Sequence, residues 1–241
     1  MREKRIFMND TLAIIRSVFA ECGFLQYAEG EKGEKFALLF EELIAFNNIT
    51  NLTAITECEE VALRHFADSL TAADKIPEGA TVIDVGCGGG FPTLPLAIAR
   101  PDLAITALDS TAKKLVFVEN MAKKLSLNVK TLAARAEETP EYRESFDVAT
   151  SRAVARMNLL TELCLPLVKV GGRFVAMKGA SGREELSEAE DGIVKLGGNV
   201  TDVDAFTLLS AGERVLITVK KTSPTPPAYP RPWGKIKKKP L

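Results

Sequence analysis

The sequence predicts an α/β fold in which helices precede a mostly parallel sheet that ends in an antiparallel hairpin. The first observation is a change of period after residue 77, where short β-rich apolar runs begin to alternate with helical stretches. That alternation is typical of βαβ units. The second is that the last two runs, 201–209 and 214–220, are separated by only four residues. So short a link favours a hairpin over a crossover helix.

Three helices are expected before the sheet, over residues 10–22, 34–46 and about 56–73, because apolar side chains recur there at helical spacing. Gly23 is a suitable stop for the first helix, and Thr56 with Glu59 has the spacing of a capping box. The turn at Pro77-Glu78-Gly79 marks the expected boundary. We therefore expect a helical region over 1–76 and a sheet domain over 77–221.

The sheet domain divides into seven expected strands and four helices. Besides the hairpin, the strands are expected at 81–85, 104–108, 129–132, 146–150 and 173–177, and the helices at 93–100, 112–125, 158–165 and 183–196. Apolar residues make up 46% of the chain and charged residues 26%, the usual mix for a globular protein. A single α/β domain with a small extension accounts for the 241 residues.

The last twenty residues, 222–241, have a composition of their own. They hold six of the twelve prolines and five cations without an acid, so the preceding part must sum to −6 for a net charge of −1. We expect this tail to be extended, with no core of its own, and to contact a polyanion. The cations are Arg231, Lys235, Lys237, Lys238 and Lys239.

Several classes of protein are excluded by residue types. There is one histidine, and none of the four cysteines forms a C-x-x-C pair, so we expect no metal site. No apolar run is long enough to cross a bilayer, and no signal peptide follows the charged N-terminus. Scattered free cysteines suit a reducing compartment. We expect a cytoplasmic monomer.

The strongest motif is Asp84-Val85-Gly86-Cys87-Gly88-Gly89-Gly90, in which a buried strand leads through a glycine-rich turn into a helix. A dinucleotide fingerprint would need glycine at Phe91 or Thr93, and a phosphate loop would need a following lysine. The remaining pattern, D-V-G-x-G-x-G, is typical of S-adenosylmethionine-dependent methyltransferases.

Two aspartates end neighbouring strands beside this turn. Asp109 lies about 20 residues beyond the glycines, where a carboxylate can accept hydrogen bonds from both ribose hydroxyls. Asp84 is tolerable beside a sulfonium cation, but an aspartate at a strand end also often caps the following helix.

Beyond the glycine turn, the chain resembles the RsmG family, also called glucose-inhibited division protein B. R-H-F-x-D-S-L at 64–70 and S-R-A-V-A at 151–155 make the resemblance specific. Further matching stretches are at 51–55, 84–92, 108–110 with Lys113-Lys114, 135–137, 178–179 and the tail. The resemblance implies a Rossmann-like class I methyltransferase fold and an enzyme that methylates guanine N7 in 16S ribosomal RNA of the small subunit.

The resemblance also implies a cofactor site for S-adenosylmethionine. The positions that match the family site are Gly86, Phe91, Asp109, Ser110, Ala136, Glu137 and Arg152. Two departures bear on it. Thr93 stands where the family usually has glycine, at the start of a helix, and the tail reads Arg231-Pro232-Trp233-Gly234 where the family usually has R-K-x-G.

Other side chains have alternative interpretations. Arg152 and Lys178 follow strands near the expected cleft and could contact the target base or a phosphate. The alternative for Arg152 is a surface or ion-paired arginine, and the alternative for Lys178 is a solvated side chain. His65 fits a structural role better than a ligand contact. The tail cations would bind phosphate, and Trp233 could stack on a base. The alternative functions are methylation of a small molecule or protein, and non-catalytic RNA binding in ribosome assembly.

The expected chemistry requires positioning rather than proton transfer. Guanine N7 already has an in-plane lone pair, so its methylation needs no general base. Correct juxtaposition of two reactants can supply roughly 7–11 kcal/mol. A chain with one histidine and no catalytic cysteine motif is consistent with that requirement.

Overall fold

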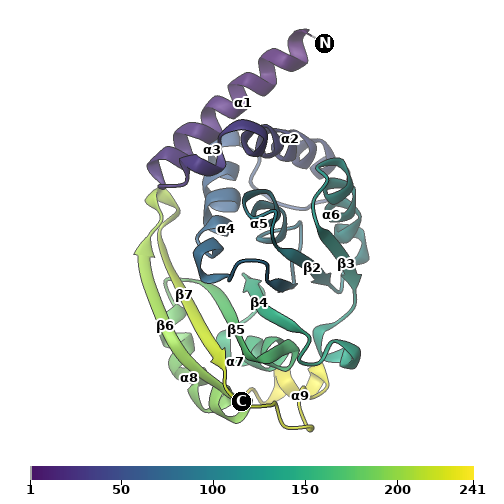
Figure 1. The fold of residues 1–241 in the computed structure, drawn as a ribbon, viewed down its shortest axis with the longest axis vertical. Coiled ribbons are helices and arrows are strands. Elements are labelled where there is room, and N and C mark those ends of the chain that lie inside the picture. The colour runs from purple at the N-terminus through teal and green to yellow at the C-terminus, as the bar shows by residue number, and fades with distance from the viewer. Residues whose placement is uncertain (1) are drawn as a thin grey trace.

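The computed structural model describes residues 2–241, with side chains described from residue 9 onward. Seven strands form one sheet (Figure 1). The strands are β1 (Thr81–Val85), β2 (Ala104–Asp109), β3 (Val129–Ala133), β4 (Phe146–Arg152), β5 (Val168–Gly179), β6 (Gly198–Thr207) and β7 (Glu213–Lys221).

The strand order is β3-β2-β1-β4-β5-β7-β6. β1 pairs in parallel with both β2 and β4. β2 and β3 are added on one side of β1, and β4 and β5 on the other, so the strand order reverses between β1 and β4. β7 lies antiparallel between β5 and β6. The predicted fold, a mostly parallel seven-stranded sheet with a C-terminal antiparallel hairpin, is confirmed. Both hairpin strands are somewhat longer than the sequence pattern indicates.

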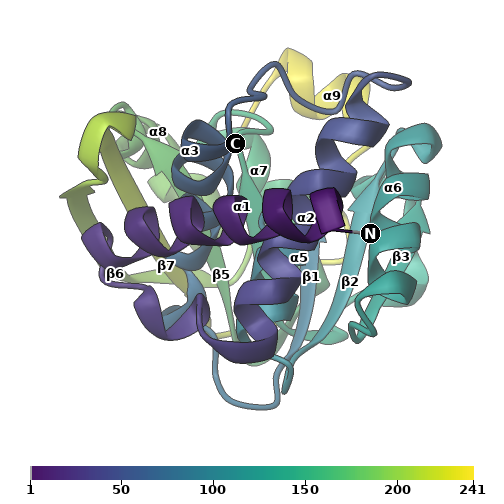
Figure 2. The same ribbon diagram turned by 90° about the horizontal axis from the view of Figure 1, so that it is seen from above.

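Helices cover both faces of this sheet (Figures 1 and 2). Their bounds are α1 (Arg2–Glu21), α2 (Gly30–Asn47), α3 (Cys58–Val61), α4 (Asp68–Leu70), α5 (Thr93–Ala99), α6 (Ala112–Lys124), α7 (Met157–Cys164), α8 (Gly182–Lys195) and α9 (Trp233–Lys238). A π-helical turn, Ala62–Ala67, joins α3 to α4, so the expected third helix is interrupted by a wider turn.

Alternating side chains of the central strands build two cores. Val82 and Val148 pack toward α5 and residues 72–80, whereas their neighbours Ile83 and Ala149 pack toward α7 and α8. The period of two that defines a strand therefore separates the two faces. Since these strands are buried on both sides, their sequences read as continuous apolar runs.

The N-terminal helices share a core with the sheet domain. Phe36 of α2 lies against Phe19 of α1 and Phe66, with ring centroids 5.1 Å and 5.3 Å apart. Phe66 in turn lies 6.2 Å from Phe91, which follows the glycine turn. The same cluster includes Leu94 of α5. The helices before residue 77 are thus packed onto the sheet domain through α1, α2 and the turn that carries Phe66.

The expectation of an extended tail is wrong for Trp233–Lys238, which is helical. The tail has no core of its own, as expected, but it packs on the core of the sheet domain. It forms α9, in which the Ile236 side chain is completely buried against the core around α7 and α8. The Arg143 guanidinium donates to the carbonyls of Tyr229 (2.6 Å) and Pro226 (3.2 Å). Composition indicated an open chain because the groups that hold the tail lie about 70 to 90 residues earlier in the sequence.

Within residues 2–241, no helix combines the length and apolar character needed to span a bilayer.

The shared aromatic core predicts a single cooperative unfolding transition. Phe36→Ala should lower the free energy of unfolding of the whole chain by about 3–5 kcal/mol, because it leaves a cavity between helices and domain. Urea denaturation followed by circular dichroism and by Trp233 fluorescence measures both parts. As a control, Ile49→Ala removes a side chain that is 82% exposed and should change stability by less than about 0.5 kcal/mol. Two separate transitions, with only the first shifted by Phe36→Ala, would contradict this packing.

Candidate functional site: a cavity at the ends of β1, β2 and β4

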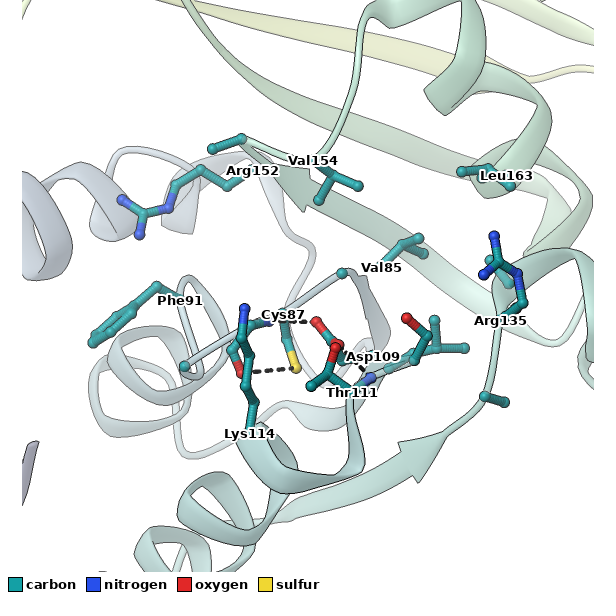
Figure 3. A pocket seen from close by; sticks show the side chains of 18 of the residues that line it. Val85, Cys87, Phe91, Asp109, Thr111, Lys114, Arg135, Arg152, Val154 and Leu163 are labelled. Atoms are coloured by element: carbon teal, nitrogen blue, oxygen red, sulfur yellow. Dashed lines mark hydrogen bonds between the residues drawn. The ribbon is translucent and has the colours of Figure 1, made fainter. Parts of the chain in front are cut away.

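A cavity of about 490 Å³ lies where β1, β2 and β4 end (Figure 3). In open α/β sheets, ligands bind beyond the carboxyl ends of the strands where the order reverses, and here that point is between β1 and β4. The volume is within the usual range for small-molecule sites. The fold therefore places the cavity where a ligand is expected.

The glycine turn forms one wall and is fastened to β2. The backbone N–H groups of Gly86 and Cys87 both donate to the Leu108 carbonyl, at 2.8 Å and 3.1 Å. Gly86 has φ of 75°, and a Cβ there would lie 2.5 Å from Cγ2 of Val154, on the loop after β4. Only glycine fits this position, because both its backbone angle and the approach of Val154 exclude a side chain.

Asp109 is held across from the turn. Its Oδ2 accepts a hydrogen bond from the Gly88 N–H (2.9 Å), and its Oδ1 accepts one from the Thr111 N–H (2.7 Å). Figure 3 shows the carboxylate between the glycine turn and the start of α6. Each carboxylate oxygen can accept more than one hydrogen bond. The side chain is therefore fixed in place and retains acceptor capacity.

Asp84 has a different role from Asp109. It is only 1% exposed and does not line the cavity. Its Oδ2 accepts hydrogen bonds from the backbone N–H (3.2 Å) and hydroxyl (2.7 Å) of Thr93, so it caps α5. The capping alternative is confirmed for Asp84. The hydroxyl of Thr93, the residue that departs from the family pattern, is used in this contact. Burial raises the pKa of Asp84 to about 6, despite these hydrogen bonds.

Phe91, His65 and Arg152 form a stacked group at one end of the cavity. The rings of His65 and Phe91 are stacked with centroids 4.6 Å apart, and Arg152 Cζ lies 5.7 Å from the Phe91 centroid. His65 Nε2 shares a 2.7 Å hydrogen bond with Thr53 Oγ1. Burial and the charge of Arg152 lower the pKa of His65 to about 4. His65 is thus neutral at physiological pH and supports Phe91.

Arg152 is ion-paired and still lines the cavity. Its guanidinium donates to Asp68 Oδ2 (2.7 Å) and to the carbonyl of Arg64 (2.8 Å), which lies in the π-helical turn. Asp68 also accepts a hydrogen bond from Arg214 Nε at 2.6 Å. A carboxylate shared between two arginines fixes both guanidinium groups, of which only Arg152 lines the main cavity.

A second cavity of about 330 Å³ adjoins the first and shares Arg152 and Ala153 with it. Its lining includes Arg214 and Lys178. The alternative that Lys178 is solvated is wrong, because the side chain is buried and its Nζ is ion-paired with Glu185 at 2.6 Å. Its Nζ also donates to the Ala155 carbonyl at 2.7 Å.

The opposite end of the main cavity is built from three segments. Ala136 and Glu137 follow β3, Leu163 comes from α7 and Trp233 from α9. Glu137 Oε1 accepts a hydrogen bond from Arg135 Nε at 2.6 Å. Arg135 Cζ in turn lies 5.4 Å from the centroid of the Trp233 ring.

The structure brings together all seven residues predicted to form the cofactor site. Gly86, Phe91, Asp109, Ser110, Ala136, Glu137 and Arg152 all line the main cavity. Sequence reasoning missed Leu52, Val154 and Leu163. Leu52 and Val154 lie within stretches that carry the family resemblance, but Leu163 is an ordinary helix residue with no distinguishing signal.

The predicted RNA-binding residues of the tail lie in three different surroundings, and one of them, Trp233, lines the main cavity. Lys235, Lys237, Lys238 and Lys239 are exposed on and just after α9. The guanidinium of Arg231 instead binds Glu162 of α7, whose side chain is fully buried, with Nε 2.9 Å from Oε1. Arg231 therefore has a partner that the sequence prediction did not include.

Residues that could serve as a nucleophile or a metal site are scarce. Burial raises the pKa of the Cys87 thiol well above its usual value, so Cys87 fills the glycine turn as a neutral side chain. From residue 9 to the C-terminus, no three His, Cys, Asp or Glu side chains are grouped as metal ligands would be. The site is a shaped cavity with fixed polar groups.

The sheet order and the glycine turn facing Asp109 define the class I methyltransferase fold. Three solved structures share it at low sequence identity. A 1,6-didemethyltoxoflavin-N1-methyltransferase from Burkholderia thailandensis has a TM-score of 0.53 at 16% identity, covering 78% of this chain and 88% of that chain. The precorrin-6y C5,15-methyltransferase from Geobacter metallireducens has a TM-score of 0.51 at 18% identity, with 72% and 92% covered. The [4+2]-cyclase SpnF has a TM-score of 0.53 at 16% identity, with 65% and 82% covered.

The chain belongs to the GidB family, described as rRNA small subunit methyltransferase G, whose family model matches residues 32–214. Relatives named ribosomal RNA small subunit methyltransferase G support the same family assignment. One from Lactobacillus delbrueckii is 46% identical over 217 residues, covering 86% of this chain and 91% of that protein. One from Desulfitobacterium hafniense is 45% identical, with 88% and 90% covered. One from Lactobacillus johnsonii is 44% identical over 237 residues, with 95% and 98% covered.

The buried carboxyl of Asp84 predicts a pH-dependent stability difference between the protein and Asp84→Asn. Because its folded pKa is raised from 3.8 to about 6, the protonated group favours folding at low pH, and this contribution is lost as pH rises through 6. From pH 4.5 to 7.5 the free energy of unfolding of the protein should fall by about 2 kcal/mol relative to that of the variant. Urea denaturation at several pH values measures this difference.

The control for this experiment is Asp191→Asn, on the exposed surface of α8. Its free energy of unfolding plotted against pH should run parallel to that of the unsubstituted protein. Parallel curves for Asp84→Asn as well would mean that Asp84 is not held in the buried position seen here.

Proposed function

We propose that this protein is an S-adenosylmethionine-dependent methyltransferase that methylates N7 of a guanine in 16S ribosomal RNA of the small subunit. Family membership supports the reaction and the class of substrate. The single observation that carries the cofactor assignment is Asp109, fixed by Gly88 and Thr111 at the edge of the cavity. A carboxylate so placed accepts hydrogen bonds from a ribose diol.

The residues of the main cavity fit this cofactor. Asp109 would hold the ribose, with Ser110 beside it, and the bare backbone at Gly86 would allow a ligand to approach closely. Phe91 would line the amino acid end, and Ala136 with Glu137 the purine end. When bound, S-adenosylmethionine supplies an electrophilic methyl group on its sulfonium sulfur.

The chain's own groups support transfer by positioning. Guanine N7 needs no deprotonation, and the side chains that could act as bases are unsuited to it: His65 is stacked on Phe91, and the Cys87 thiol remains protonated. Arg152 is fixed by Asp68 and the Arg64 carbonyl at the border of both cavities. It would orient the acceptor base relative to the methyl donor, and such orientation can account for much of the rate.

The second cavity is the proposed entry for the acceptor nucleotide. It opens beside the main cavity at Arg152 and Ala153, and Arg214 and Lys178 add positive charge to its wall. These cations are partly neutralised by Asp68 and Glu185, which keeps them fixed. Duplex RNA hides N7 in a deep, narrow groove, so the target guanine would have to be unstacked to enter.

RNA is favoured over a small-molecule acceptor by the surface of the tail. Lys235, Lys237, Lys238 and Lys239 are exposed, and Trp233 at the start of the same helix lines the main cavity. A strip of lysines beside the site would bind backbone phosphates without reading sequence. A non-catalytic assembly factor would not need the fixed carboxylate of Asp109.

The proposed function is tested by mass mapping of 16S ribosomal RNA from cells with and without the gene. One 7-methylguanosine should be absent without the gene, and the purified protein with S-adenosylmethionine should restore it on small-subunit RNA or particles. An unchanged modification pattern would contradict the proposed substrate, and would favour a small-molecule acceptor or an assembly role.

Asp109→Ala should weaken binding of S-adenosylmethionine by about 1–3 kcal/mol, because two ribose hydrogen bonds are lost. Isothermal titration calorimetry measures the dissociation constant. Asp191→Asn, which removes a carboxylate on α8, is the control and should bind as tightly as the unsubstituted protein. Equal affinity of Asp109→Ala would remove Asp109 from the site.

The triple variant Lys237→Gln, Lys238→Gln and Lys239→Gln should bind 16S ribosomal RNA more weakly. The slope of log affinity against log salt should fall by about 2, since each phosphate contact contributes roughly 0.7 to 0.9. Filter binding at several salt concentrations measures it, and cofactor affinity should not change. Deletion of the tail is a poorer test because it would expose the core under Ile236 and leave Glu162 buried without its partner. An unchanged slope would exclude these lysines as phosphate contacts.

A further inference from the structure

Trp233 is the only tryptophan in the chain, and it lies in a segment that composition describes as a basic tail. It begins α9 and lines the main cavity, 70 residues after Leu163 of α7, the helix on which α9 packs. The tail thus contributes a large aromatic surface to a site otherwise built from the sheet domain and the helices around it.

Specific contacts hold Trp233 in this place. Two residues earlier, Arg231 is bound by Glu162: its backbone N–H and its Nε both donate to Oε1, at 2.8 Å and 2.9 Å. Three residues later, Ile236 is fully buried. Undocking the tail would leave the buried Glu162 carboxylate without Arg231, which would strongly destabilise the folded protein. The indole is therefore held in a fixed position on both sides.

Trp233 is also linked to the loop that follows β3. Arg135 lies against the indole ring, with Cζ 5.4 Å from its centroid, and Glu137 binds Arg135 Nε at 2.6 Å. Figure 3 shows Asp109 between Phe91 on one side and Arg135 with Leu163 on the other. With the ribose at Asp109, the end bounded by Arg135, Leu163 and Trp233 is left for the purine.

We propose that the C-terminal tail is part of the methyl-donor site, and that Trp233 closes the end of the cavity that holds the adenine of the cofactor. This inference rests on the proposed function. A purine needs an apolar face that excludes water, and an aromatic side chain supplies one. Docking of the tail through Arg231 and Ile236 therefore sets cofactor affinity, in addition to any contact that the tail lysines make with RNA.

The experiment uses the full chain and S-adenosylhomocysteine as the probe. Calorimetry gives the dissociation constant, and the emission of Trp233 reports whether the ligand reaches the indole. In the unsubstituted protein, S-adenosylhomocysteine should change the emission with the same dissociation constant as the heat. Trp233→Ala should bind about tenfold more weakly, and Trp233→Phe, which keeps an aromatic face, should recover most of that loss. Asp191→Asn, on the exposed surface of α8, is the control and should not differ.

The possible results separate this inference from the proposed function. If Trp233→Ala binds S-adenosylhomocysteine as tightly as the unsubstituted protein, the tail is not part of the donor site, whatever the emission does, and the proposed function stands. If Trp233→Phe binds as weakly as a folded Trp233→Ala, an aromatic wall is excluded. If the unsubstituted protein shows neither heat nor a change in emission, the inference and the proposed function both fail. Should Trp233→Ala not fold, Trp233→Phe and the emission of the unsubstituted protein decide: an unchanged emission in the presence of binding heat overturns the inference.

Discussion

The hydrogen bond between the Gly88 N–H and Asp109 Oδ2 is the constraint on which the site depends. It joins the glycine turn after β1 to the end of β2, and the bonds from Gly86 and Cys87 to the Leu108 carbonyl reinforce it. Together they hold a bare stretch of backbone opposite a fixed carboxylate. The cavity exists because these glycines have no side chains to fill it, and because Val154 approaches too closely for any residue but glycine at position 86.

The fold alone does not determine the reaction that this cavity performs. A [4+2]-cyclase, a precorrin-6y methyltransferase and a didemethyltoxoflavin methyltransferase share this fold at 16–18% identity. Function therefore depends on the side chains of the site and is indicated by family membership. The site contains a fixed carboxylate, a neutral stacked histidine and a protonated thiol. Those groups are suited to holding two reactants in line, and N7 methylation requires little else.

Segments outside the sheet domain complete the site at both ends. The N-terminal helices bring His65 against Phe91 and supply Asp68, which fixes Arg152. The C-terminal tail brings Trp233 to the opposite end. A chain divided at the expected boundaries of 76 and 221 would place these residues in separate regions. The shared packing instead makes one cavity from all three, so residues of the first and last segments line the same space.

The sequence by itself determined the sheet, the hairpin and the position of the main cavity, because these follow from local patterns. The short apolar runs that alternate with helical stretches, the short link between the last two strands and the glycine turn before Asp109 are each visible in nearby residues of the sequence. The family resemblance added the seven positions predicted to bind the cofactor, all of which line one cavity. Local patterns of this kind can be interpreted without knowledge of the three-dimensional contacts.

Only the tertiary structure decided how the charged and aromatic side chains are used. Composition could not show that Arg231 binds a buried carboxylate on α7, that Lys178 is paired with Glu185, or that the tail carries Trp233 into the cavity. A cation in a polar tail reads as solvated until its partner is known, and that partner lies 69 residues away for Arg231. The free energy of such a pair depends on burial and geometry, which no local stretch of sequence specifies.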